Sequence, residues 1–132
     1  MDPIECFAWA ILRFEGFRSG SMSWRNRNPG NLRSSSLAYK VREGYAVFES
    51  FERGWAALIR DLRAKFAGAP YTSTGLGPNS TLLEFFEKYA PGSDGNKPRG
   101  YAQFVADALT ESLEREVTLK TTLREIQQGT AG

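Results

Sequence analysis

The sequence contains no histidine, and one cysteine stands among its 132 residues. Without histidine there can be no Ser-His-Asp triad, no Cys-His nucleophile pair and no histidine-ligated zinc site. The lone Cys6 cannot form an internal disulfide, so packing alone must hold the fold. Carboxylates, tyrosines and amides are the side chains that remain for catalysis.

Strong charge and long apolar runs are absent as well. The formal net charge is +2, from 17 basic and 15 acidic residues, which is far weaker than expected of a dedicated nucleic-acid-binding domain. No run is long enough to span a bilayer, and the N-terminus lacks the basic start and cleavage site of a signal peptide. We therefore expect one domain over residues 1–132, made in the cytoplasm, with no stable membrane insertion.

What the sequence does have is helical periodicity. Asp2 and Pro3 are typical of a helix start, and apolar residues at helical spacing then run to near Gly16. Further helices are predicted over residues 51–67, after the capping box of Thr81 and Glu84, along the stripe from 101 to 109, and over residues 122–128.

Loops and one hairpin separate these helices. Residues 20–36 and the stretches "GAPYTSTGLGPNS" and "APGSDGNKPRG" have the composition of loops. The stretch "LAYKVREGYAVF" has two runs of strand-forming residues around Arg-Glu-Gly, which predicts a small β-hairpin. The expected fold class is α+β, mostly α, with one hairpin.

Glu15 stands where the pattern of the first helix calls for an apolar residue. The stripe of Ile4, Phe7, Ala8 and Ile11, continued by one step of four, reaches Glu15. An acidic side chain therefore extends the row that faces the core.

The surroundings expected for Glu15 favour its protonated form. Phe14 and Phe17 should desolvate it, the end of the helix presents carbonyl groups, and no cation lies next to it within the turn. A carboxylic acid that stays protonated near neutral pH is what cleavage of a glycosidic bond requires. The alternative is a solvent-exposed side chain, or one paired with Arg18 or Arg33.

The order of four motifs supports the catalytic interpretation. "AWAILRFEGF", "RNRNPGNLR", "YAVFESFERGWAALIRDL" and "FFEKYAPGSDGNKPRGYAQFVADAL" follow one another from about Ile4 to Leu109. This succession resembles the small phage and bacterial peptidoglycan-cleaving domains of the lysozyme-like superfamily, which include lytic transglycosylases and glucosaminidases. The order and spacing of the motifs are more specific than any one of them.

The resemblance implies a lysozyme-like helical domain with a small β-hairpin beside a saccharide cleft. It also implies cleavage of the β-1,4 bond between N-acetylmuramic acid and N-acetylglucosamine, without a metal or an organic cofactor. The essential glutamate of the family maps onto Glu15, as general acid and base. The asparagine-rich turn that lines the cleft maps onto Asn28 and Asn31, and the tyrosine of "KYAP" maps onto Tyr89.

Other residues are candidates for lining the cleft because of their place in the pattern. Amide side chains offer donors and acceptors to acetamido and hydroxyl groups, although turn geometry alone also explains both asparagines. Phe48 and Ser50 lie beside the end of the hairpin, and a core position is the alternative for Phe48, Tyr89 and Tyr101. The candidate substrate-binding residues are Asn28, Asn31, Phe48, Ser50, Tyr89 and Tyr101.

Members of the family differ in whether they use a second carboxylate. Hydrolysing lysozymes usually place one across the cleft, whereas lytic transglycosylases use one glutamate and release a 1,6-anhydro sugar. Glu43 and Glu49 lie on or near the predicted hairpin, and nothing in the sequence directs either of them toward Glu15. The sequence therefore favours the one-glutamate transglycosylase and leaves the hydrolase open.

Two other functions remain as alternatives. One is a non-catalytic lysozyme-like protein of a virion or a cell-wall-binding protein, since a fold can outlast its activity. The other is a nucleic-acid-binding module, suggested by Arg25, Arg27 and Arg33 in "SWRNRNPGNLR". The expected partner is a peptidoglycan glycan strand rather than nucleic acid. The protein is expected to be a monomer that reaches the wall as a released endolysin, by export or within a virion.

Overall fold

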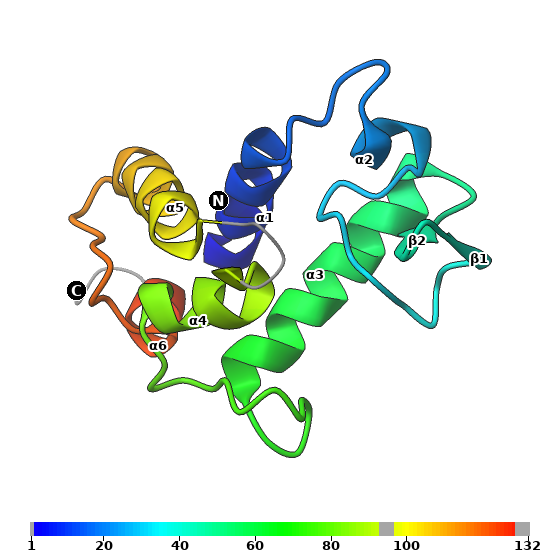
Figure 1. Ribbon diagram of the computed structural model, residues 1–132. Helices are drawn as coiled ribbons and strands as arrows, with labels where there is room; N and C mark the ends of the chain where they lie inside the picture. The colour runs from blue at the N-terminus through cyan, green and yellow to red at the C-terminus, as the bar shows by residue number, and fades with distance from the viewer. Residues whose placement is uncertain (1, 93–96, 129–132) are drawn as a thin grey trace.

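The computed structural model of the chain describes residues 2–92 and 97–128. It is mostly helical, with one two-stranded antiparallel sheet (Figure 1), so the expected α+β class is confirmed. The elements in chain order are α1 (Pro3–Phe14), α2 (Met22–Arg25), β1 (Lys40–Arg42), β2 (Tyr45–Val47), α3 (Phe51–Ala67), α4 (Leu82–Tyr89), α5 (Pro98–Leu113) and α6 (Leu123–Gln128).

Local capping signals set the starts of α1, α4 and α6. The Asp2 side chain accepts a hydrogen bond from the first turn of α1. At α4, the Thr81 hydroxyl accepts from the Glu84 N–H and the Glu84 carboxylate accepts from the Thr81 N–H, at 3.1 and 2.8 Å. Thr122 and Glu125 form the same reciprocal pair at α6. Each predicted cap is therefore present, because it depends only on residues within one turn.

The structure differs from the sequence prediction in two segments. Residues 20–36 were expected to be loop, but they contain α2, a four-residue helix capped by the Ser21 hydroxyl. One turn is too short to show helical periodicity. Helix α5 begins at Pro98, inside the stretch expected to be loop, because proline is well suited to the first position of a helix. Residues 93–96 of that stretch lie outside the described residues.

The predicted hairpin is present and turns at Glu43 and Gly44. Lys40 pairs with Val47 and Arg42 with Tyr45. Both turn residues have positive φ angles, 54° and 83°, as expected for a two-residue turn between twisted antiparallel strands.

The core forms around α1, which packs against α5 on one side and α3 on the other (Figure 1). The ring of Phe7 is fully buried, with its centroid 5.2, 5.0 and 5.9 Å from those of Phe66, Phe85 and Phe86. Three aromatic partners from α3 and α4 therefore fix the position of α1. Within residues 2–92 and 97–128, no helix combines the length and apolar character needed to cross a membrane.

Helix α3 connects the helical core to the hairpin. Figure 1 shows α2, β1 and β2 beside one end of α3, and α4 beside its other half. The chain before the hairpin approaches α3 closely at Gly54, where an added Cβ would lie 2.0 Å from the Arg27 carbonyl oxygen and 3.0 Å from Pro29 Cδ. Gly54 therefore allows the segment that carries the predicted turn to pack directly on α3.

Candidate active site around Glu15

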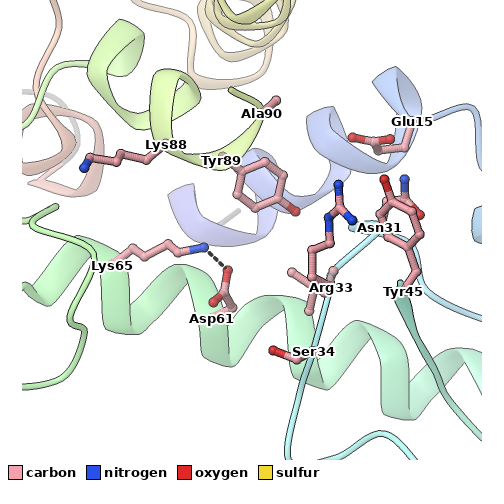
Figure 2. Close-up of a pocket in the computed structure, with 11 residues that line it drawn as sticks. Glu15, Asn31, Arg33, Ser34, Tyr45, Asp61, Lys65, Lys88, Tyr89 and Ala90 are labelled. Carbon is pink, nitrogen blue, oxygen red and sulfur yellow. Dashed lines mark hydrogen bonds and ion pairs between the residues drawn. The ribbon is translucent and has the colours of Figure 1, made fainter. Parts of the chain in front are cut away.

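Glu15 lines a pocket of about 250 Å³ that is shared by five parts of the chain (Figure 2). The end of α1, the segment after α2, strand β2, α3 and α4 all contribute side chains. Those that bear on its chemistry include Glu15, Asn31, Arg33, Tyr45, Asp61 and Tyr89. We call this cavity the Glu15 pocket.

Glu15 is the C-cap residue of α1, and its N–H still donates to the Ile11 carbonyl at 2.9 Å. Gly16 follows with a φ of +67°, the left-handed conformation in which glycine commonly ends a helix. The helix therefore ends at Glu15, whose side chain lines the pocket.

Two side chains hold the Glu15 carboxyl. The Tyr101 hydroxyl donates a hydrogen bond of 2.7 Å to Glu15 Oε2, and the Asn31 side chain also hydrogen-bonds the carboxyl. Desolvation by burial raises the pKa of Glu15 above its usual value of 4.5, and these two hydrogen bonds partly oppose that rise. The expected direction of the shift and its leading cause are both confirmed.

Tyr101 lies in α5 and is 2% exposed. Its ring stacks between Phe14 and Phe86, with centroid separations of 3.8 and 4.3 Å. Burial, together with electrostatic interaction with Tyr89 and Glu15, raises the pKa of Tyr101 well above its usual value. The hydroxyl therefore stays protonated and acts as a fixed donor to Glu15.

The two asparagines of the predicted turn have different roles. Asn28 is fully buried, and its Nδ2 donates to the carbonyls of Leu32 and Ala46 at 2.9 and 3.0 Å, while its Oδ1 accepts from the Leu32 N–H at 2.9 Å. These bonds tie the turn to β2 and leave no part of the amide for a ligand. The structure therefore gives Asn28 a supporting role in the turn, and its assignment to substrate binding stays a prediction without support from the geometry.

Asn31 does line the Glu15 pocket. Its N–H donates to the Asn28 carbonyl at 3.0 Å, which closes the turn, and its φ is +51°. Asparagine tolerates this left-handed conformation better than most residues. The turn therefore aims the Asn31 side chain at Glu15. The Asn31 Oδ1 atom is buried without a hydrogen-bond partner among the described residues.

Tyr89 lies at the end of α4 and also lines the Glu15 pocket. Its hydroxyl donates to the Gly30 carbonyl at 2.6 Å. A Cβ at Gly30 would lie 2.9 Å from that hydroxyl oxygen and 2.6 Å from Leu58 Cδ1, so glycine is required for this close contact. Tyr89 thus fixes the turn from the side of α4. Burial, with smaller contributions from Asp61 and Glu15, raises its pKa well above the usual value.

Four other candidates lie elsewhere. Phe48 is fully buried in the hydrophobic core, and the Ser50 hydroxyl caps α3 by accepting from the Arg53 N–H at 3.1 Å. Neither lines the Glu15 pocket, so the structure adds no support to their assignment to substrate binding. Glu43 lies in the hairpin turn and Glu49 follows β2. Both are exposed, and neither is part of the pocket lining.

The second carboxylate of the pocket is Asp61 in α3, which the sequence analysis did not identify. Asp61 Oδ2 lies 2.6 Å from Lys65 Nζ. The spacing of four predicts such a pair on the surface of a helix, but it does not tell which surface. Only the packing of α3 against α4 and the turn places this pair opposite Glu15 (Figure 2).

The arginines of "SWRNRNPGNLR" line two different pockets. Arg33 lines the Glu15 pocket, and its guanidinium carbon lies 4.5 Å from the centroid of the Tyr45 ring. Arg25 and Arg27 instead line a separate pocket with Trp24. Only Arg33 of the three is therefore part of the Glu15 pocket.

The described residues hold no cluster of three or more cysteine, aspartate or glutamate side chains that could bind a metal ion. The pocket instead holds the half-buried carboxyl of Glu15, which has Tyr101 and Asn31 as hydrogen-bond partners. The ion pair of Asp61 and Lys65 lies across the pocket from it. Comparison of the chain with protein-family models, with curated proteins and with solved structures finds no match.

Proposed function

We propose that this chain is a lysozyme-like enzyme that cleaves the β-1,4 bond between N-acetylmuramic acid and N-acetylglucosamine in bacterial peptidoglycan. The supporting observation is the Glu15 carboxyl, which lines an open polar pocket, has a raised pKa and is oriented by Tyr101 and Asn31. A carboxyl with a raised pKa keeps its proton to higher pH than an ordinary glutamate, and a protonated carboxyl can protonate a glycosidic oxygen. The helical core and the hairpin around the pocket agree with the lysozyme-like fold of this proposal.

In the proposed reaction, Glu15 donates its proton to the glycosidic oxygen as the bond from that oxygen to C1 of the muramoyl sugar breaks. The acetamido oxygen of the same sugar stabilises the positive charge that develops at C1. Tyr101 and Asn31 stabilise the Glu15 carboxylate formed at this point, because both hydrogen bonds favour the anion.

The second half of the reaction returns the proton to Glu15. The carboxylate takes it from the muramoyl 6-hydroxyl while that oxygen bonds to C1, which gives a 1,6-anhydro product. If water takes the place of the 6-hydroxyl, the product has a reducing end instead. In either case Glu15 finishes protonated and ready for another cycle.

The one-glutamate route is the preferred form of this proposal. Asp61 is the other acid of the pocket, but its charge is matched by Lys65 at 2.6 Å. A carboxylate engaged in this way is a weaker stabiliser of the oxocarbenium charge, so Asp61 does not require the hydrolytic mechanism. We therefore propose a lytic transglycosylase that reaches the wall by release, export or incorporation into a virion, and acts as a monomer.

Digestion of purified peptidoglycan, followed by mass spectrometry of the soluble fragments, tests this function. Fragments with anhydromuramoyl ends are expected, and reducing ends would identify a hydrolase. Glu15→Gln keeps the size of the side chain and should lower the cleavage rate by about 10² to 10⁴-fold, the usual contribution of a general acid. Glu49→Gln is the matched control, because this glutamate is exposed and outside the pocket, and it should retain activity.

Three results would contradict parts of this proposal. Absence of fragments from the folded wild-type protein, together with sedimentation of the protein with the wall, would favour a non-catalytic wall-binding protein. Equal cleavage by wild type and Glu15→Gln would exclude Glu15 as the acid. A salt-sensitive shift of nucleic acid in a gel, without binding to the wall, would favour the nucleic-acid alternative.

A further inference from the structure

The two ends of the Glu15 pocket differ in charge. Glu15 and Asn31 form one end, whereas Lys65 and Lys88 lie on the far side of Tyr89 (Figure 2). In the whole lining, three basic side chains stand against two acidic ones. When Glu15 is protonated, as the proposed reaction requires, the pocket has an excess of positive charge.

Lys65 is held in place within this lining. Its ammonium is bonded to Asp61 at 2.6 Å and lies 4.9 Å from the centroid of the Tyr89 ring and 5.9 Å from that of Phe85. The Lys65 side chain is 13% exposed. Asp61 matches its charge, so Lys65 supplies a fixed hydrogen-bond donor rather than an excess cation.

Lys88 supplies the positive charge that Asp61 does not match at the α4 end of the pocket. It is exposed at the end of α4, and no hydrogen bond or ion pair joins it to another of the described residues. Its neighbour one turn earlier, Glu84, is the usual partner at this spacing. The Glu84 carboxylate instead accepts from the Thr81 N–H at 2.8 Å, at the start of the helix. The Lys88 ammonium is therefore available to a ligand in the pocket.

We propose that the α4 end of the Glu15 pocket is a subsite for a carboxylate of the glycan substrate, with Lys88 as its main cation and Lys65 as a second donor. This inference rests on the proposed function. The muramoyl sugar carries a lactyl group that ends either in a free carboxylate or in a stem peptide with carboxylates of its own. An oligomer of N-acetylglucosamine carries none. The subsite would thus select muramoyl glycans over neutral ones.

Binding to the full-length Glu15→Gln protein, which should leave the glycan intact, tests the subsite by calorimetry. The three probes are muramoyl glycan oligomers with stem peptides, the same oligomers after amidase treatment, and N-acetylglucosamine oligomers of equal length. Lys88→Met should weaken binding of a carboxylate-bearing probe about threefold, the size of an exposed ion pair. Lys88→Glu should weaken it about tenfold, because repulsion replaces attraction.

The probes separate the possible sources of the carboxylate. If the Lys88 variants lose affinity only for peptide-bearing oligomers, the bound carboxylate belongs to the stem peptide. If they lose affinity only for amidase-treated oligomers, it belongs to the lactyl group. Lys120→Met is the control, since Lys120 is an exposed lysine outside the pocket lining, and it should change none of the three affinities.

Other outcomes would overturn the inference. If the Lys88 variants bind all three probes with unchanged affinity, or lose affinity equally for the neutral oligomers, the subsite is disproved while the proposed cleavage can still stand. If none of the probes binds the folded Glu15→Gln protein, both the subsite and the proposed function fail. A thermal melt of each variant checks that the fold is retained.

Discussion

Tyr101 donates a 2.7 Å hydrogen bond to Glu15 from a position 86 residues further along the chain. The bond joins α5 to the end of α1, and the buried tyrosine ring leaves its hydroxyl little freedom. Because a hydrogen bond to the charged form favours that form, it keeps the pKa of Glu15 from rising as far as burial alone would take it. The balance between burial and this hydrogen bond sets the pH range in which Glu15 is an acid.

The activity should fall as pH rises through the raised pKa of Glu15. The reaction needs the protonated carboxyl, so the alkaline limb of kcat/KM should lie above the usual glutamate value of 4.5. Tyr101→Phe removes a donor that favours the anion, and the limb should move to higher pH. Initial rates of wall clearing across a pH series check both statements. An unchanged limb in Tyr101→Phe would contradict the role given to Tyr101.

The stability of the fold should also depend on Glu15. An acid with a higher pKa in the folded chain binds its proton more tightly there, so unfolding releases the proton. The free energy of unfolding should therefore fall, relative to that of Glu15→Gln, as pH rises from about 4.5 to the raised pKa, and then level off. Urea unfolding of both proteins at several pH values measures this difference. A difference independent of pH would contradict the raised pKa.

Substitution of Asn28 should mainly lower the stability of the fold, whereas substitution of Asn31 should mainly lower the cleavage rate. Asn28→Ala leaves the buried backbone groups of Leu32 and Ala46 without their partners, and we expect the free energy of unfolding to fall by about 3 kcal/mol. Asn31→Gly suits the left-handed backbone and should change the free energy of unfolding by about 1 kcal/mol or less. Its cleavage rate should fall, and its alkaline limb should shift to higher pH, because Glu15 loses a hydrogen bond.

Urea unfolding and pH-rate profiles of the two asparagine variants test this contrast. Equal loss of stability in both variants would mean that Asn31 also has a mainly structural role. A stable Asn28→Ala protein with weakened substrate binding would support the substrate-binding role predicted for Asn28 from the sequence.

Gly54 should be intolerant of a side chain despite its helical position. Alanine is a better helix former by about 1 kcal/mol, but its Cβ would meet the Arg27 carbonyl oxygen at 2.0 Å. We expect Gly54→Ala to lose about 1 to 3 kcal/mol of stability. Gly100→Ala in α5 is the matched control, since the nearest atom to its Cβ would be 4.0 Å away, and it should be neutral or stabilising. Thermal melts of the two variants give the comparison.

Much of the local structure could be predicted from the sequence. The span of α3, the hairpin and the capping boxes of Thr81 and Thr122 depend on residues within a few positions of one another. Glu15 was identified in the same way, by one helical step beyond an apolar stripe. Helix α2 was not predicted, because a single turn held by the Ser21 cap shows no periodicity.

The partners of each side chain were decided by the tertiary structure. The sequence alone determined that Glu15 ends a helix on its apolar face. It could not tell that Tyr101 would reach Glu15, or that the backbone would use the amide of Asn28 and leave that of Asn31. Nor could it tell that Asp61, rather than Glu43 or Glu49, would be the second carboxylate of the pocket. The physical reason is that periodicity fixes the face a residue occupies, whereas an amide or a carboxylate accepts any partner that packing brings within hydrogen-bonding distance.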